Sequence, residues 1–503
     1  MKIFSTEQIR AWDAYTIQHE PIASADLMAR AAKVFADWLA GLYPDTRRPI
    51  AVFAGTGNNG GDGVVAARLL HWLNYEVKVY VCDFSGKKSA DFSAHLSYSP
   101  KDVDIITLKH PDDLKTLNLP EKALIVDALF GSGLNRPLEG EWALLIDRLN
   151  ALPNEIVSID LPSGLLADTA TPGNSVVRAH RTFSFETPKR AFFFPENAER
   201  VGEWACGSIG LHLDYYTATE TPFHFLTHSQ AALLLRPRAK FSHKGSYGHA
   251  LLIAGSYGKI GAAVLAARAC LRAGAGLLTV HAPRCGNIVL QTTVPEAMFS
   301  GDRRALVWTS VPETNSFNAI GVGCGIGQSP ETAAAFETLI KETNKALVID
   351  ADALNLLAQA PGLWRSVPRN SILTPHPKEF ERLFGKTAND FERNDLQRHK
   401  AQEHGVFIVL KGAHTAIACP DGACWFNSTG NPGMATGGSG DVLTGMLTGL
   451  LARGYAPRDA ALLGVFLHGL AGDLAAKALG QEAVTAGDLV AWVGQAWQAL
   501  EDM

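Results

Sequence analysis

The sequence predicts an α/β protein built of two doubly wound, three-layer domains. Short apolar segments of strand length alternate with helical segments in both halves, and glycine-rich or acidic clusters follow several of these strands. A length of 503 residues also exceeds what one ordinary hydrophobic core accommodates. A weakly patterned, threonine-rich passage at about residues 213–229 separates the halves. We therefore expect domains at residues 1–215 and 225–503.

Composition and charge narrow the class of protein. Hydrophobic residues make up 47% and charged residues 19% of the chain, as in globular proteins. No segment approaches the ~18 uninterrupted apolar residues of a membrane span, and the N-terminus lacks a secretory-signal pattern, so we expect a cytoplasmic protein with no membrane association. The net charge of -5, without a basic patch, argues against nucleic-acid binding but leaves small anionic ligands open.

The cysteines indicate reduced thiols rather than a disulfide framework or a zinc site. There are seven, they are scattered, and none forms a CxxC pair. Cys419 and Cys424 flank a Pro-Asp-Gly turn, so we expect them to face each other across a hairpin and to serve as packing residues.

In the first half, residues 49–54 form an apolar run that leads into a glycine loop, followed by a predicted helix at 64–73. Further strands are predicted at 75–82, 123–128 and 155–160. This alternation favours a mostly parallel sheet, in which ligands bind at the carboxyl edge of the strands.

Three polar clusters are predicted to meet at that edge. The run Gly55–Gly63 follows a strand and opens a helix, but it is neither GxGxxG nor a Walker loop. Its asparagines and Asp62 offer oxygens suited to a polar ligand and a weakly held alkali cation. Residues 127–137 and 160–164 also follow strands and contain acids and glycines. Each cluster alone could be a turn or a helix cap, but three in register favour a ligand site.

The second half repeats the architecture without repeating the sequence. Strands are predicted at 249–254, 277–281, 319–322, 346–349 and 406–410, and helices at 262–275 and 441–453. Residues 255–263 and 321–327 are glycine-rich, residues 411–415 read Lys-Gly-Ala-His-Thr, and residues 374–380 carry His376 and Glu379. Each could be a tight turn, and a lone histidine is more often a packed or surface residue than a ligand. Together they form a ring of strand-end loops.

The most informative segment is residues 430–446, where a glycine run ends in an acid at the start of an apolar helix. Gly437, Gly438 and Gly440 can take backbone angles that let successive amide hydrogens converge on one anion. The positive end of the following helix adds to that field, which suits a phosphoryl group in transfer. We interpret Asp441 as the base that takes a proton from an attacking hydroxyl. The alternative is a glycine-rich turn that merely caps the helix.

On these motifs the first half resembles the NAD(P)H-hydrate epimerase domain, a Rossmann-like fold. The resemblance rests on Asn-Asn-Gly-Gly-Asp at 58–62, on residues 131–137 and on Asp-Leu-Pro-Ser-Gly at 160–164. It implies a substrate site with Asp160 as the acid/base, and a potassium ion held by Asn59, Asp127 and Ser163. The implied substrate contacts are Asn58, Asn59, Gly60, Gly61, Asp62, Gly131, Ser132, Gly133, Leu134, Asn135, Arg136, Pro137 and Asp160.

The second half resembles the ribokinase-like superfamily and, within it, the ADP- or ATP-dependent NAD(P)H-hydrate dehydratases. The string Asn-Pro-Gly-Met-Ala-Thr-Gly-Gly-Ser-Gly-Asp is highly specific, although Lys378 replaces the glycine usual after His-Pro. The resemblance implies contacts to the hydrate from Ala262, Gly325, His376 and Asp441. It implies contacts to the nucleotide from Lys411, Gly412, Ala413, His414, Thr415 and Gly440.

Taken together, the resemblances imply a bifunctional enzyme that repairs damaged nicotinamide cofactors. It would interconvert the R and S hydrates of NADH and NADPH (NADHX and NADPHX) and dehydrate the S form with consumption of ADP, giving AMP and phosphate, with Mg²⁺ on the nucleotide. Alanine-rich helices and tryptophans lead us to expect a homo-oligomer. The alternative is a vitamin or sugar kinase fused to a non-catalytic nucleotide-binding module. A dehydrogenase is least favoured, because neither half has GxGxxG followed by an acid at the expected spacing.

Overall fold

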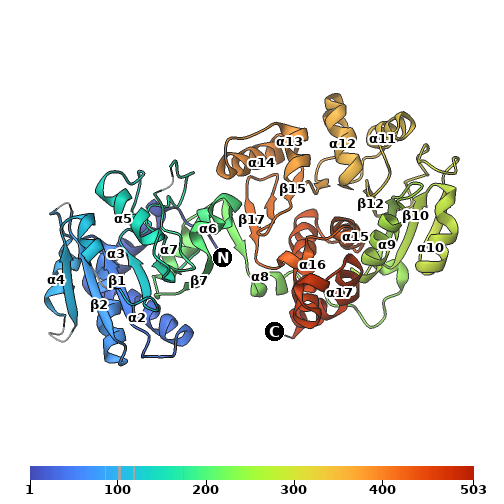
Figure 1. Ribbon diagram of the computed structural model, residues 1–503. Coiled ribbons are helices and arrows are strands. Elements are labelled where there is room, and N and C mark those ends of the chain that lie inside the picture. The colour runs from blue at the N-terminus through green and yellow to red at the C-terminus, as the bar shows by residue number, and fades with distance from the viewer. Residues whose placement is uncertain (85, 100–102, 117–118, 174, 503) are drawn as a thin grey trace. The chain divides into compact units, whose positions relative to one another are not determined.

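The computed structural model describes residues 1–84, 86–99, 103–116, 119–173 and 175–502, and the chain divides into two compact units (Figure 1). The first unit comprises Lys2–Thr221 together with Asn389–Phe391. The second comprises Met1, Pro222–Ala388 and the chain from Glu392 onward. The main passage from one unit to the other therefore falls between Thr221 and Pro222.

The first unit is built on a parallel sheet, seven-stranded in the described part of the chain, with the order β3-β2-β1-β4-β5-β6-β7. The chain reverses its direction of progress across the sheet between β1 and β4, so the carboxyl ends of these two strands mark the topological switch point. The strands are β1 (Ile50–Ala54), β2 (Val77–Cys82), β3 (Asp104–Leu108), β4 (Leu124–Ala128), β5 (Ile156–Ile159), β6 (Arg181–Phe185) and β7 (Glu203–Gly207).

Helices cover both faces of this sheet. Alternate residues of β1 point to opposite faces: Val52 packs with α2 and α3, and Phe53 packs with α5. The helices are α1 (Thr6–His19), α2 (Ser24–Leu42), α3 (Asn58–Trp72), α4 (Ala90–Ser97), α5 (Glu141–Asn150), α6 (Ala198–Val201) and α7 (Leu213–Ala218), with 3₁₀ turns η1 (Pro111–Thr116), η2 (Arg190–Phe193) and η3 (Pro195–Asn197).

The second unit holds a larger sheet, ten-stranded among the described residues, with the order β11-β10-β9-β12-β13-β14-β15-β16-β17-β8. Its pairs are parallel except where β16 meets β15 and β17. The switch point lies between β9 and β12. The strands are β8 (Phe223–Leu226), β9 (His249–Ile253), β10 (Leu277–Ala282), β11 (Met298–Gly301), β12 (Ala319–Val322), β13 (Leu347–Ile349), β14 (Ile372–Leu373), β15 (Phe407–Leu410), β16 (Ala416–Ala418) and β17 (Cys424–Asn427).

This sheet is also sandwiched between helical layers. Leu252 faces α9, α15, α16 and α17, whereas Leu251 faces α11, α12 and α13. The helices are α8 (His228–Ala232), α9 (Ile260–Arg272), α10 (Asn287–Thr293), α11 (Pro330–Glu342), α12 (Ala351–Gln359), α13 (Pro377–Phe384), α14 (Asp390–His404), α15 (Ser439–Ala452), α16 (Pro457–Leu479) and α17 (Ala486–Glu501), with 3₁₀ turns η4 (Lys244–Tyr247), η5 (Arg284–Gly286), η6 (Pro361–Ser366), η7 (Pro432–Met434) and η8 (Gln481–Ala483).

Among the described residues, α16 is long and apolar enough to cross a membrane by length and composition, with a window of mean hydropathy 1.4. However, 56% of that window is buried, and the helix contributes Leu463, Phe466 and Leu467 to the core shared with α15 and α17. Packing inside the unit therefore accounts for its apolar composition.

The predicted fold class is confirmed, with three local corrections. The segment Asn58–Asp62, predicted as a loop, is the first turn of α3, and α15 begins at Ser439, before Asp441. The predicted hairpin exists as β16 and β17, but Cys424 pairs with Ala418 and not with Cys419. The two cysteines are offset because Cys419 lies beyond the end of β16, where its N–H donates to Ala423 O. None of the seven cysteines, all of which lie in the described part of the chain, forms a disulfide.

Candidate active sites

In the first unit, three of the predicted clusters meet at Gly131. A Cβ atom at this position would lie 2.9 Å from Asn59 Oδ1 and 3.1 Å from Asp160 Oδ2. Asn59 belongs to the first turn of α3, Gly131 follows β4, and Asp160 follows β5. The N-terminus of α3 and the ends of two adjacent strands thus enclose one polar site beside the switch point.

Small residues allow α3 to start so close to the sheet. A Cβ atom at Gly60 would lie 1.7 Å from the carbonyl oxygen of Gly55, and one at Gly61 would lie 2.4 Å from Met28 Sδ. Neither glycine has a positive φ, so close approach rather than an unusual backbone angle requires them. The glycines of this run therefore position the helix N-terminus.

Asp160 is held as an ionised carboxylate. It has a left-handed backbone (φ 66°), its Oδ2 accepts a hydrogen bond of 2.9 Å from the Ser132 N–H, and its Oδ1 lies 3.0 Å from Lys189 Nζ. Burial alone would raise the pKa of Asp160, but the positive charge of Lys189 and the hydrogen bonds from Ser132 outweigh it and lower that pKa. Asp160 is therefore a charged residue that is only 8% exposed and has a strained backbone, which makes it a strong candidate for a catalytic group.

Lys189 was not predicted from the sequence. It is only 1% exposed, and its ammonium group also donates to Ser184 Oγ at 2.8 Å, to Thr187 O at 3.2 Å and to Phe185 O at 3.3 Å. A buried ammonium needs both a counter-charge and several acceptors, and it has both here. Its signal in the sequence was weak, because it lies in a loop four residues beyond β6 with no glycine or acid motif around it.

Two further carboxyl groups near Asp160 hold protons more tightly than usual. Burial, followed by the negative charge of Asp160, raises the pKa of Asp13 to about 7, although Lys189 opposes this. Burial and the charges of Asp160 and Asp13 raise the pKa of Asp62 well above its usual value. The site therefore combines one ionised carboxylate with neighbours that carry protons near neutral pH, an arrangement suited to proton transfer. Asp13, on α1, was also missed from the sequence.

The predicted potassium ligands are only partly free to bind a cation. Asn59 Nδ2 is buried and has no hydrogen-bond partner among the described residues, as expected of an amide that orients toward a ligand. Ser163 Oγ accepts the Phe130 N–H at 2.8 Å and lies 3.0 Å from Phe130 O. Asp127 is fully buried, and its two oxygens already accept hydrogen bonds from Ser158, Ser163 and Leu129. Amide, hydroxyl and carbonyl oxygens suit a monovalent cation, with Asp127 orienting Ser163.

The outer wall of this site is exposed. Gly133 and Asn135 lie at the surface with Arg136, and the carbonyl of Gly133 accepts a hydrogen bond of 2.8 Å from Arg10. Asn58 is exposed, whereas Ser132, Leu134 and Pro137 are half-buried. These residues are available to a ligand from the solvent side.

In the second unit, a cavity of about 450 Å³ opens at the switch point between β9 and β12. The loops after these strands are joined by a hydrogen bond of 2.8 Å from the Gly255 N–H to Cys324 O. Three of the residues predicted to bind the hydrate line this cavity, together with residues of α12 and α13. The lining comprises Gly258, Lys259, Gly261, Ala262, Gly325, Ala351, Asp352, Asn355, Glu379 and Asp441.

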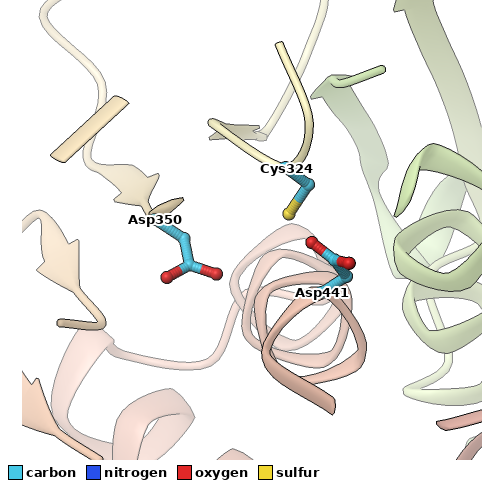
Figure 2. Close-up of side chains that lie close together, drawn as sticks. All are labelled: Cys324, Asp350 and Asp441. Carbon is cyan, nitrogen blue, oxygen red and sulfur yellow. The ribbon is translucent and has the colours of Figure 1, made fainter. Parts of the chain in front are cut away.

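Asp441 lies in the first turn of α15, where the helix N-terminus follows Gly438 in the left-handed region (φ 94°). Figure 2 shows its carboxylate close to the Cys324 sulfur. Burial raises the pKa of Asp441 to about 6, a hydrogen bond from Cys324 and the charge of Lys411 lower it, and the negative charge of Asp350 raises it. A carboxylate with a pKa near 6 is ionised at neutral pH and more basic than an ordinary aspartate, which suits a general base.

A partly buried ion pair stands beside Asp441. Asp350, at the end of β13, is 1% exposed; its Oδ1 lies 3.0 Å from Lys411 Nζ, and its Oδ2 accepts the Thr444 hydroxyl at 2.8 Å. The same ammonium lies 3.4 Å from where a Cβ at Gly440 would stand. Lys411 is thus brought to the N-terminus of α15, the predicted phosphoryl site. Sequence reasoning missed Asp350, although an acid directly after the predicted strand 346–349 was visible.

His376 does not line the cavity but contacts a residue that does. It is the N-cap of α13: its Nδ1 accepts the backbone N–H groups of Lys378 and Glu379 at 3.1 and 3.4 Å. Its Nε2 lies 3.4 Å from Glu379 Oε1. Burial is the main cause that lowers the pKa of His376, so the ring is neutral at pH 7. Lys378 adopts an ordinary helical backbone, so glycine is not required there.

The remaining nucleotide candidates lie in the connection from β15 to β16 and do not line the cavity. Thr415 closes this loop, because its hydroxyl donates to Gly412 O at 3.0 Å and accepts the Gly412 N–H at 3.3 Å. His414 Nδ1 lies 3.2 Å from Asn427 O, and burial lowers its pKa. Gly412 has open space beyond its Cα atom. Lys411 is the member of this segment that reaches the active-site cluster.

The trio Cys324, Asp350 and Asp441 does not form a magnesium cage, although its ligand atoms lie within 4.8 Å of one another (Figure 2). Burial and the neighbouring carboxylates raise the pKa of the Cys324 thiol well above its usual value, and Asp350 is already bonded to Lys411 and Thr444. Magnesium prefers hard oxygen ligands and usually binds through one or two carboxylates and substrate phosphates. The residues fit a magnesium ion that arrives on a nucleotide rather than one held by this trio.

The fold and the second site define a ribokinase-like α/β enzyme fused to a second, Rossmann-like domain. Comparison with a ribokinase-like superfamily protein of Enterococcus faecalis supports the fold: identity is 27% and the TM-score is 0.51, over 57% of this chain and 99% of that one. The family model for NAD(P)H-hydrate dehydratase matches residues 250–493, and that for the YjeF-related protein N-terminus matches residues 24–191.

Curated relatives match across both units. The bifunctional NAD(P)H-hydrate repair enzyme Nnr of Moorella thermoacetica is 36% identical over 469 residues, which cover 90% of this chain and 88% of that protein. The Nnr of Escherichia coli is 36% identical over 472 residues, covering 92% and 88%. The chain therefore belongs to the family of bifunctional NAD(P)H-hydrate repair enzymes, as the sequence motifs predicted.

Proposed function

We propose that this protein epimerises the R and S forms of NADHX and NADPHX in its first unit and dehydrates the S form in its second. The observation that carries the proposal is the position of Asp441: a carboxylate with a pKa of about 6 lines the switch-point cavity and stands at the N-terminus of α15 beside Lys411. Phosphoryl transfer needs this combination of base, amide dipoles and cation.

In the dehydration step, Asp441 accepts the proton of the ring hydroxyl as the hydroxyl oxygen attacks the terminal phosphorus of ADP. A new oxygen–phosphorus bond forms, the bond from that phosphorus to the leaving oxygen breaks, and AMP departs. The nitrogen lone pair of the ring then expels phosphate, and loss of a proton from the neighbouring carbon restores the dihydronicotinamide. Lys411 and the N–H groups around Gly440 offset the negative charge of the group in transfer.

The residues proposed to contact the hydrate are Ala262, Gly325, His376 and Asp441. His376 is supported by its neutral ring and by its contact with Glu379, which lines the cavity. The residues proposed to hold the nucleotide are Lys411, Gly412, Ala413, His414, Thr415 and Gly440. We propose ADP as the donor, and we propose that Mg²⁺ enters on its phosphates.

In the epimerisation step, Asp160 takes the proton of the hydroxyl at the carbon that also bears the ring nitrogen. The carbon–nitrogen bond breaks as a carbonyl forms, with the bonding pair moving to nitrogen. Closure on the opposite face returns the proton and inverts the centre. The Lys189 ammonium keeps Asp160 ionised and thus ready to accept the proton. The residues at 58–62 and 131–137 are proposed to surround the substrate, and Asn59 and Ser163, with Asp127 behind them, to hold potassium.

A cytoplasmic location and a homo-oligomeric state complete the proposal. Seven cysteines without a disulfide among them support a reducing compartment. The main rival, a vitamin or sugar kinase fused to a non-catalytic module, is disfavoured by the relatives that match both units under one bifunctional name.

The experiment that tests the proposal incubates the protein with mixed hydrate epimers and ADP, ATP or no nucleotide, each with and without potassium. Absorbance reports the regenerated dihydronicotinamide, and free phosphate is measured in parallel. We expect both products with ADP and slower conversion of the R form without potassium. A stable phosphorylated compound without NADH would support the kinase instead, and equal repair without nucleotide would refute the phosphoryl-transfer step.

A further inference from the structure

A second cavity adjoins the one that contains Asp441. Its volume is about 470 Å³, and it is lined by Gln328, Asn355, Ala358, Gln359 and Arg382. Asn355, on α12, lines both cavities, so the two spaces are neighbours that share one wall residue. A dinucleotide consists of two nucleotides of similar size, and single ligand cavities range from about 300 to 1,000 Å³. Two adjoining cavities of similar volume match the two halves of such a molecule.

The two cavities differ in charge. The first is lined by three carboxylates, those of Asp352, Glu379 and Asp441, and by one cation, Lys259, so its lining has an excess of negative charge. The second is lined by no carboxylate among the described residues, and it has one cation, Arg382. A phosphorylated group distant from the reacting ring is therefore better accommodated in the second cavity, because like charges repel.

Neutral amides form most of the polar lining of the second cavity. Gln359 Nε2 donates to Gln328 Oε1 at 2.9 Å, and Gln328 Nε2 donates to Asp352 Oδ1 at 3.0 Å. Side-chain amides both donate and accept hydrogen bonds, so they suit the ring edge of a purine and the hydroxyls of a ribose. This chain of amides fits an adenosine group.

Arg382 is positioned for a phosphate. It is exposed, and its Nη1 donates to Asn355 Oδ1 at 2.8 Å, which fixes the guanidinium above α12. The other N–H groups of the planar fork stay available for a bidentate contact, the geometry that favours phosphate. The positive charge of Arg382 is felt at His376, a proposed contact to the hydrate. The guanidinium thus lies within electrostatic reach of the reaction site without lining its cavity.

We propose that the second cavity binds the adenosine half of the substrate and that Arg382 recognises the 2′-phosphate that distinguishes NADPHX from NADHX. The inference rests on the proposed dehydratase function and adds the part of the site that would set cofactor preference. A phosphate monoester on the distant ribose is a dianion, whereas the linking diphosphate must lie near the junction at Asn355. Arg382, the one cation in the described lining of the second cavity, is therefore assigned to the monoester.

The test measures kcat/KM for purified S epimers of NADPHX and NADHX with the full-length protein and its Arg382→Gln variant. Charge-assisted hydrogen bonds contribute about 1.5–3 kcal/mol, so kcat/KM for NADPHX should fall about 10- to 100-fold. That for NADHX should fall by no more than about threefold. Arg382→Lys should restore part of the preference, since it keeps the charge but not the fork. Arg365→Gln, an exposed arginine of η6 outside both cavities, is the matched control and should leave both values unchanged.

Inhibition of dehydration by the products provides a second measurement. With AMP present at saturation, the inhibition constant of NADPH should rise about tenfold or more in Arg382→Gln while that of NADH changes little. Equal losses for both substrates would assign Arg382 to the diphosphate and overturn the proposal, as would an unchanged preference. If the parent protein dehydrated neither substrate, the proposed function itself would fail. That result differs from the two outcomes that overturn only the role of Arg382.

Discussion

Lys411 and Asp350 form a partly buried ion pair, with 3.0 Å between Nζ and Oδ1, next to Gly440 in the first turn of α15. The pair acts on Asp441 with opposite signs: the Asp350 charge raises the pKa of Asp441 and the Lys411 charge lowers it. Thr444 holds the second oxygen of Asp350 at 2.8 Å, so the carboxylate cannot turn away. Burial is the main cause that raises the pKa of Asp441, and the two charges of this ion pair adjust that pKa in opposite directions.

We expect this pair to control the pH dependence of dehydration. Asp441 must be ionised to act as a base, so kcat/KM should rise with pH through a midpoint near 6. Asp350→Asn removes a negative neighbour, lowers the pKa of Asp441 and should move that midpoint to lower pH. Lys411→Gln should move it to higher pH. The pH profiles of the two variants, compared with that of Glu337→Gln on the exposed face of α11, check this. If the midpoints of the two variants moved in the same direction, Asp441 would not be the group whose ionisation controls dehydration.

The two activities should be separable by single substitutions. Asp441→Asn removes the base and should lower dehydration by about 10²–10⁴-fold while leaving epimerisation intact. Asp160→Asn should do the reverse. Epimerisation is measured by following the R and S forms chromatographically without nucleotide, and dehydration with the purified S form.

One complication applies to Asp160→Asn, because it leaves the Lys189 ammonium buried without its counter-charge. Removal of one partner of a buried ion pair typically costs about 3–5 kcal/mol of stability. The double variant Asp160→Asn/Lys189→Met removes both charges and separates loss of chemistry from loss of folding. Epimerisation that persisted in a folded double variant would reject Asp160 as the acid/base.

The carboxyl group of Asp13 should make the protein less stable as the pH rises from about 4 to about 7. Its pKa is raised to about 7 in the folded state, above its value of 3.8 in an unfolded chain. A raised folded pKa gives stability that is fully present below pH 4 and is lost as the pH rises through 7. Asp13→Asn should therefore have a melting temperature close to that of the parent at pH 4 and higher than that of the parent at pH 7 and at pH 8.5. Calorimetry at these pH values checks the sign, with Asp37→Asn on the exposed side of α2 as the control.

Much of the fold and part of the two sites could be predicted from the sequence. Apolar runs such as residues 50–54 and 124–128 are buried on both faces of a parallel sheet, so periodicity and length identify them. The more polar edge strand β7 and the short β14 carry no such signal and were missed. The glycine clusters at 55–63 and 430–446 could be found in the sequence because both combine several glycines with acidic or amide residues. That α3 and α15 begin inside these clusters, at Asn58 and at Ser439, was not visible, because the sequence placed the helix starts at about Val64 and Asp441.

The charged groups that surround the proposed catalytic acids could not be predicted from the sequence. Lys189 meets Asp160 from 29 positions away in the chain, and Asp350 meets Lys411 from 61 positions away. No local spacing encodes such pairs, because sheet order alone brings them together. Arg382 could not be predicted from the sequence either. It lines the second cavity, and its connection with the motif residues is Asn355, which lines both cavities.

Close packing at the start of α3 gives a steric test of the first site. A Cβ atom at Gly60 would meet a backbone oxygen at 1.7 Å, which no side-chain rotation relieves. Gly60→Ala should therefore displace the helix N-terminus, remove epimerisation and lower the stability of the first unit by several kcal/mol. Gly57→Ala, where nothing lies within 4 Å, is the matched control and should fold normally. Dehydration of purified S substrate should survive in both, and an epimerase-active Gly60→Ala would show that the helix start is not part of that site.

The final prediction concerns Gly440, where the steric argument takes another form. A Cβ atom there would lie 3.4 Å from Lys411 Nζ and 3.6 Å from Asp350 Oδ2, which are ordinary contact distances, so Gly440→Ala should fold with unchanged melting temperature. The added methyl group would nevertheless fill the space between the ammonium and the amide groups of α15, where the transferred phosphoryl group is proposed to lie. Nucleotide binding should weaken at least tenfold and dehydration should fall with it, whereas Gly437→Ala, facing open space, should change both much less. Calorimetric titration with ADP in both variants decides: if Gly440→Ala bound ADP as the parent does, the phosphoryl group would have to lie elsewhere, and the role of Asp441 as its neighbouring base would fall as well.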